Sequence, residues 1–164
     1  VDNFPTFFSG TIEENIRRVR PNISGTEFDD VLEISGLKNI AKDLSEGLAT
    51  PLDITGSSLS QAHKLTIALA RALASSPNLL LLDETITNLD KHAQVYLKKN
   101  LDKIGEGKTL VIASNDLRFV LDFDWILVLE NGEVVGQGQH KDLMKQCPLY
   151  VQLIEMEQAL SFDT

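Results

Sequence analysis

Short apolar runs alternate along this chain with longer stretches whose apolar residues recur at helical spacing, a pattern that predicts a mixed α/β protein. The most regular stretch is residues 60–75, where apolar residues and alanines form a continuous helical face. Pro77 follows and ends the helix, because proline has no amide hydrogen and restricts the residue before it. The four leucines at 79–82 then predict a short strand covered on both faces, as in parallel sheets.

The residues before this stretch predict a helical region. Ser9 or Thr11 is expected to cap a first helix, with two glutamates in its first turn. Thr26 is expected to cap a second helix that ends at Gly36, and a short helical segment follows at 37–44. A small helical hairpin packed on a core is the simplest interpretation of this region.

The residues after the leucine run continue the alternation of helix and strand. The predicted elements are a helix at 90–104, a strand at 109–113, a helix at 117–121, a hairpin turning at Asn131-Gly132, and helices at 141–145 and 148–160. Helices alternating with strands favour a mostly parallel sheet.

Composition narrows the class of protein. The chain has 164 residues, enough for one domain with a core, and a formal net charge of −9, which argues against nucleic-acid binding. Its apolar runs are far shorter than the roughly 20 residues of a membrane helix. The single cysteine, Cys147, cannot form an internal disulfide, so a reducing compartment is compatible.

Two adjacent carboxylates stand where the leucine strand ends. Open α/β sheets bind their ligands at the carboxyl ends of strands, so Asp83 and Glu84 are candidates for a metal ligand and a general base. The plain alternative is an ordinary buried strand that happens to end in two acids.

The run LSQAHKLTIALARALASSPNLLLLDETITNLD resembles the signature helix, Walker B strand and D-loop of an ABC transporter ATP-binding domain. The similarity extends over nearly the whole chain. It implies a single, partial P-loop NTPase domain over residues 1–164, with a mostly parallel sheet and a C-terminal hairpin plus helices. A helical subdomain would occupy about 10–58, and the C-terminal part of the catalytic core about 59–164.

The resemblance also assigns roles to residues. It implies that Asp83 binds Mg²⁺, that Glu84 polarises the attacking water, and that Asp90 in the D-loop caps a helix and touches the partner subunit. The signature positions would contact the γ-phosphate of ATP held by the opposite subunit: Leu59, Ser60, Gln61, Ala62 and His63. His63 is better interpreted as a polar residue at the helix start than as a metal ligand, since no histidine or cysteine lies at ligand spacing.

Several positions depart from the family pattern. Gln61 and Ala62 replace the two glycines that let backbone amides approach the phosphate, so a weakened contact is expected. Asn3 stands where the glutamine of the Q-loop would be, and Asn115 stands where the switch histidine would be. Asparagine donates a hydrogen bond but carries no charge, so fast hydrolysis is not expected. Residues 52–54 also differ from the usual run before the signature.

The chain contains no Walker A motif. GEGKT at 105–109 lacks the required earlier glycine, because Asp102 stands there, and it leads from a helix into a strand. We therefore expect a C-terminal fragment of the domain that begins at the Q-loop and, alone, binds ATP poorly and is inactive. Three arrangements could complete its sheet: a companion chain, exchange with a second copy, or a different closure of the sheet.

The function implied by the resemblance is that of an ATP-binding domain of an exporter-type ABC transporter, at the cytoplasmic face of the inner membrane. Whether the intact parent is an ATPase is left open by the altered site. Its cofactors would be ATP and Mg²⁺, and its partners a transmembrane domain and a second ATP-binding domain, with no nucleic acid. The alternatives are a non-catalytic regulatory or assembly module and, less favoured, a soluble ABC ATPase of repair or translation.

Overall fold

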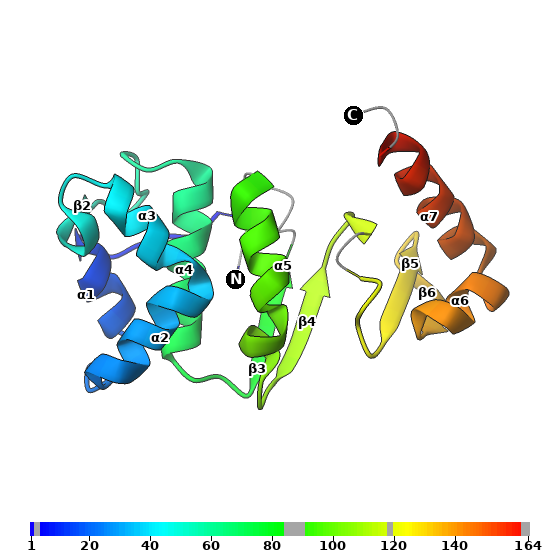
Figure 1. Ribbon diagram of the computed structural model, residues 1–164, viewed down its shortest axis with the longest axis horizontal. Helices are drawn as coiled ribbons and strands as arrows, with labels where there is room; N and C mark the ends of the chain where they lie inside the picture. Colours follow the sequence, from blue (N-terminus) through cyan, green and yellow to red (C-terminus); the bar gives the residue numbers. More distant parts are fainter. Residues whose placement is uncertain (2–3, 84–90, 118–119, 162–164) are drawn as a thin grey trace. The chain divides into compact units, whose positions relative to one another are not determined.

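A computed structural model describes residues 1, 4–83, 91–117 and 120–161. The chain forms two compact units, residues 1–114 and 115–164. Helices and short sheets occur in both (Figure 1), and the predicted mixed α/β class is confirmed. The expected division near residue 58 into a helical subdomain and a core stays a prediction.

The first helices of unit 1 begin at well-formed caps. Helix α1, Ile12–Arg17, starts after Thr11, whose side chain accepts from the amide of Glu14 while the Glu14 carboxylate accepts from the amide of Thr11. Helix α2, Gly25–Ser35, has the same capping box at Ser24 and ends at Gly36. The predicted cap at Thr26 is therefore wrong, because Ser24 has the glutamate three residues later that completes the box.

Short elements complete this helical region. Helix α3 spans Leu37–Asp43, and the 3₁₀ helix η1 spans Gly47–Ala49. Strand β1, Gly10–Thr11, pairs antiparallel with β2, Pro51–Leu52. Buried apolar side chains pack these elements against the next long helix, Gln61–Ala74. The buried side chains include Phe7, Ile12, Ile16, Phe28, Leu32, Leu37, Leu52, Ile67 and Ala70.

Helix α4, Gln61–Ala74, and strand β3, Leu79–Asp83, form the helix, turn and strand that the sequence predicts. Helix α5, Lys91–Gly105, leads through a tight turn to β4, Thr109–Ala113, so residues 105–109 join a helix to a strand as expected. Strands β3 and β4 are parallel, with Asp83 paired to Ala113.

The two faces of the β3–β4 ladder differ. Leu80 and Leu82 are buried, whereas Leu79 and Leu81 are 53% and 52% exposed and Val111 is 48% exposed. Leu110, which pairs with Leu80, lies near Gly105, so α5 covers the buried face (Figure 1). The prediction that this strand is covered on both faces is wrong within the part of the chain that the structure describes, because helices there cover one side of a two-stranded ladder.

Unit 2 is a hairpin covered by two helices. Strands β5, Ile126–Glu130, and β6, Glu133–Gly138, pair antiparallel, and the predicted Asn131-Gly132 turn is confirmed by positive φ at both residues. Helix α6, His140–Gln146, and helix α7, Pro148–Ser161, bury one face of the hairpin. Of the helix expected at 117–121, residues 118 and 119 lie outside the described residues, Leu117 is 3₁₀-helical, and residues 120 and 121 form a turn.

A buried tyrosine joins the two helices of unit 2. The Tyr150 hydroxyl lies 2.9 Å from Nδ1 of His140, and the side chain is 1% exposed. Burial raises the pKa of Tyr150. His140 is the first residue of α6, so it belongs to the helix start, as the sequence predicts.

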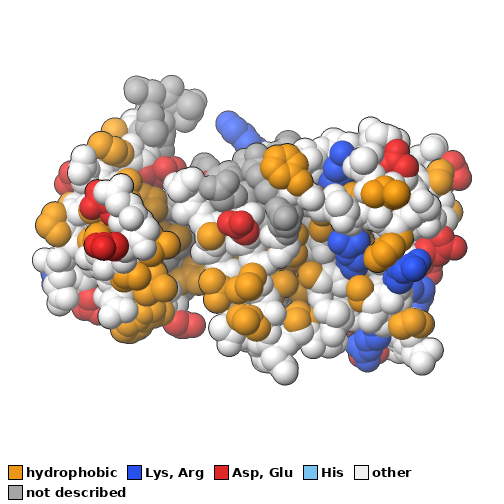
Figure 2. Space-filling model, turned by 180° about the vertical axis from the view of Figure 1, so that it is seen from behind, with side chains coloured by type: hydrophobic (Ala, Val, Ile, Leu, Met, Phe, Trp, Pro, Cys, Tyr) orange, Lys and Arg blue, Asp and Glu red, His pale blue; other side chains and the backbone are white. Residues whose placement is uncertain are grey.

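Apolar side chains also reach the surface of both units (Figure 2). Along the described helices, none is both long enough and apolar enough to span a membrane.

The exposed apolar face of the β3–β4 ladder carries a first prediction. We expect the purified 164-residue chain to self-associate through this face, and Leu81→Lys to weaken the association roughly tenfold or more, because burying a leucine contributes about 1.5–3 kcal/mol. Sedimentation velocity measures the effect. Met156→Lys, at a similarly exposed position of α7 (52%), is the matched control. Equal self-association by wild type and Leu81→Lys would contradict the prediction.

Candidate functional site

The amino end of α4 is the most regular part of the predicted site. Ser60 is its N-cap, and its side-chain oxygen accepts from the amide of His63 at 3.2 Å. Leu59 is buried in the core of unit 1 and anchors the start of the helix, whereas Ser60 is exposed. Gln61 and Ala62, in the first turn, are partly exposed. The structure thus brings the five predicted signature residues together at one helix end, where backbone amides favour negative charge.

The carboxylate of Asp53, which the sequence analysis noted only as part of the altered run 52–54, orders the loop before this helix. Asp53 Oδ1 accepts from the amide and hydroxyl of Thr55, both at 2.9 Å, and from the amide of Ser57 at 3.0 Å, and Oδ2 accepts from the Ser57 hydroxyl. These are the bonds of an Asx turn, so the order Asp-x-Thr-x-Ser was a usable signal. These bonds therefore fix the conformation of the loop that leads to Ser60.

The same bonds give a prediction about pH. The side-chain hydrogen bond from Ser57, followed by its amide, lowers the pKa of Asp53 below its usual value. The resulting stabilisation is fully present above the pKa of a free aspartate, about 3.9, and is lost as the pH falls through the lower folded value. An NMR titration of the Asp53 carboxyl should show this shift, and Ser57→Ala should raise the pKa toward its usual range.

Ser58→Ala is the control for that titration, because the neighbouring Ser58 makes none of the Asp53 bonds described above. We expect it to leave the titration of Asp53 unchanged. A wild-type Asp53 that titrates like a free aspartate would contradict the loop geometry.

Asp83 lies at the carboxyl end of β3. Helix α4 and strand β3 run in opposite directions on either side of the turn at 75–78, so the chain returns to the same end of unit 1 (Figure 1). Ser60 and Asp83 therefore share one end of this helix–strand pair. Asp83 is exposed there, as a ligand for an outside group must be.

The other predicted site residues lie outside unit 1 or outside the described residues. Asn115 follows Ala113, the partner of Asp83, by two residues and is the first residue of unit 2. Asn3, Glu84 and Asp90 lie outside the described residues. Within residues that are described, no three histidine, cysteine or acidic side chains gather to hold a metal. A single carboxylate still suits Mg²⁺, which takes most of its ligands from water and phosphate oxygens.

Arg71, in the last turn of α4, is a further polar residue that the sequence analysis did not select. Its Nη1 donates to the carbonyl of Thr6 at 2.9 Å, and its guanidinium lies 5.7 Å from the centre of the Phe7 ring. Burial lowers the pKa of Arg71. It lines a hollow of about 380 Å³, and a second hollow of about 230 Å³ is lined by Gln61 and Lys64. Arg71 thus ties the first residues of the chain to α4.

Similar proteins are found among both sequences and structures. An uncharacterized ABC transporter ATP-binding protein of Bacillus subtilis, YknV, is 33% identical over 156 residues, 95% of this chain and 26% of the relative. A probable multidrug resistance ABC transporter ATP-binding/permease protein of the same organism is 33% identical over 153 residues, 93% of this chain and 23% of the relative. A bacterial Atm1-family ABC exporter with ATP bound matches with a TM-score of 0.86 and 27% identity, covering 96% of this chain and 28% of that chain.

Fold and relatives together define a class of ATP-binding proteins, and the chain belongs to the ATP-binding proteins of the ABC transporter family. Within this family its likeness is to exporters. No family model matches the chain. The chain spans about a quarter of the length of the curated relatives described here, so the activity of a whole protein is a matter for proposal.

Proposed function

We propose that this chain is part of a protein that couples ATP binding and hydrolysis to transport out of the cell or compartment. The observation that carries the proposal is the return of α4, the turn and β3 to one end of unit 1, with Ser60 and Asp83 both there. Its support is the likeness, over 96% of the chain, to an exporter with ATP bound.

Each predicted residue has a chemical task in this proposal. The amides at the start of α4 and the Ser60 side chain would bind a phosphate of ATP held by a second ATP-binding domain. Asp83 would hold Mg²⁺, which supplies charge neutralisation for the phosphates when bound. Glu84 would accept the proton of the attacking water, and Asn115 would donate a hydrogen bond near it. Asp90 would contact the second domain.

The same residues are proposed to form a degenerate site. A glutamine at residue 61 and an alanine at residue 62 place side chains where the family has none, so amide contact with phosphate is weaker. Asn3 and Asn115 replace groups that would order the water and the γ-phosphate. We therefore propose slow turnover, with a partner domain completing one working site.

The proposed partners are a transmembrane domain and a second ATP-binding domain, and the proposed location is the cytoplasmic face of the inner membrane. Relatives that are ATP-binding/permease proteins support the first partner. The helical region of unit 1 is the surface proposed to meet the transmembrane domain.

A second candidate is a non-catalytic regulatory or assembly module that keeps the fold without turnover. The altered positions Asn3, Gln61 and Asn115 favour it. Intact carboxylates at residues 83 and 84 favour the ATPase.

The experiment that tests the proposal measures ATP binding and phosphate release by the full-length protein that contains this chain. We expect Mg²⁺-dependent release of phosphate, reduced by Asp83→Asn because one carboxylate charge on the metal is lost. Nucleotide binding without release would favour the non-catalytic module. A protein that binds no ATP would contradict both.

A further inference from the structure

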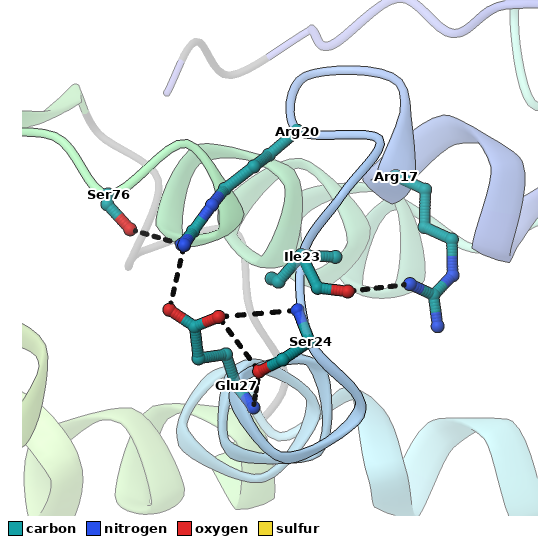
Figure 3. Close-up of polar contacts among 6 residues, drawn as sticks. All are labelled: Arg17, Arg20, Ile23, Ser24, Glu27 and Ser76. Atoms are coloured by element: carbon teal, nitrogen blue, oxygen red, sulfur yellow. Dashed lines mark hydrogen bonds and ion pairs between the residues drawn. The ribbon is translucent and has the colours of Figure 1, made fainter.

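The amino end of α2 is bonded to the turn that leads into β3. The guanidinium of Arg20 donates to the Ser76 hydroxyl at 3.0 Å and to Glu27 Oε1 at 2.8 Å (Figure 3). Glu27 also completes the capping box of α2 by accepting from the amide and hydroxyl of Ser24. Ser76 has a φ of 49°, a conformation uncommon for residues other than glycine, so this turn has a specific shape. Arg20 therefore fixes that turn to the start of α2.

The carboxyl end of α2 is bonded to α5. The Tyr96 hydroxyl donates to the carbonyl of Glu33, in the last turn of α2. The Tyr96 ring lies directly against Gly36, where an added Cβ would be 3.1 Å from Cδ1 of the ring. Gly36 also has a φ of 83°, which favours glycine, and a Cβ here would have to displace the ring by a few tenths of an ångström. Tyr96 therefore fixes α5 to the end of α2.

Along the chain, these two attachments lie before and after Asp83, the proposed Mg²⁺ ligand. Ser76 precedes β3, Asp83 ends β3, and Tyr96 lies in the helix that follows along the chain. Helix α2 has 11 residues and β3 has 5, so both are about 16 Å long. One helix of this length is thus bonded near its two ends to the turn before β3 and to the helix after it.

We propose that α2 acts as a brace, with Arg20 and Tyr96 as positioning residues that hold β3 and α5 at a fixed separation. The inference rests on the proposed function for its effect on hydrolysis, because β3 carries Asp83. A brace works only when both ends are attached, so loss of either attachment releases both elements. This distinguishes a brace from two independent surface contacts, each of which would act on its own neighbour alone.

The test uses the full-length protein with Arg20→Gln, Tyr96→Phe and the double variant. Amide hydrogen exchange is measured without nucleotide in residues 79–83 and 91–105. We expect either single variant to speed exchange roughly fivefold in both segments, since a net hydrogen bond contributes about that factor. We expect kcat for ATP to fall roughly three- to tenfold with KM little changed, and the double variant to resemble the slower single variant.

Arg18→Gln is the matched control, because Arg18 stacks on the Phe8 ring at 4.1 Å in the same part of the chain. It should change neither exchange nor kcat. The brace is overturned if each variant speeds exchange only beside its own substitution, or if the two effects on kcat multiply. The wild type could lack turnover while each single variant still speeds exchange in both segments. That result would contradict the proposed function and support the brace.

Discussion

Glu84→Gln in the full-length protein is expected to lower the rate of ATP hydrolysis roughly 100-fold or more, because removing a general base costs about 10²–10⁴ in rate. Glutamine has nearly the shape of glutamate but cannot accept the proton of the attacking water. ATP binding should therefore persist, and the loss should fall on kcat rather than on the affinity for ATP. Single-turnover phosphate release and a separate ATP-binding titration measure the two quantities.

Glu106→Gln is the control for this substitution, since Glu106 lies in the exposed turn between α5 and β4. It should hydrolyse ATP at the wild-type rate. A slow wild type that Glu84→Gln does not slow further would favour the non-catalytic module over the ATPase. Because Glu84 lies outside the described residues, this kinetic result is the direct test of its role.

Where local chemistry determines a structure, the sequence predicted it well. The turn at Asn131-Gly132 follows from two residues that tolerate positive φ, and the break before β3 follows from Pro77. Thr11 was one of the two residues, with Ser9, predicted to cap the first helix, and it is the one that does so. The cap of α2 was misplaced only because Ser24 and Thr26 both carry hydroxyls, and the glutamate at residue 27 decides between them.

Where structure depends on distant residues, the sequence did not predict it. Strands β1 and β2 are two residues each and lie about forty residues apart in the chain, too short to leave a periodic pattern. The exposure of Leu79 and Leu81 depends on which elements cover β3, and an apolar run has the same letters in either case. The bonds of Arg20 to Ser76 and of Tyr96 to Glu33 join residues far apart in sequence.

The candidate site likewise has residues that were selected from the sequence and supporting residues that were not. The motif at 59–63 and the acid at residue 83 were selected from sequence, and their shared end of unit 1 follows from the reversal of direction between α4 and β3. Asp53 and Arg71 were not selected, because their roles lie in bonds to Ser57 and to the carbonyl of Thr6. A motif reports chemistry that a family shares, whereas these supporting contacts belong to the particular packing of the chain.

Asn15→Leu is expected to lower the free energy of unfolding by about 3 kcal/mol, with roughly 1 kcal/mol for each of the side-chain hydrogen bonds that are lost. Asn15, in α1, is 1% exposed. Its Oδ1 accepts from the Phe8 amide at 2.8 Å, and its Nδ2 donates to the carbonyls of Phe8 and Thr11 at 2.8 and 2.9 Å. Leucine matches asparagine in size but bonds to none of these groups.

The effect should be large because the three bonds fix the segment that enters α1 and buries Phe7 and Ile12. A domain has only about 5–15 kcal/mol of stability, so a loss of this size moves the urea midpoint by roughly 1–2 M. Circular dichroism during urea titration measures it. Asn39→Leu, on the exposed surface of α3, should stay within about 0.5 kcal/mol of wild type. Equal midpoints for the two variants would show that Asn15 does not hold this segment.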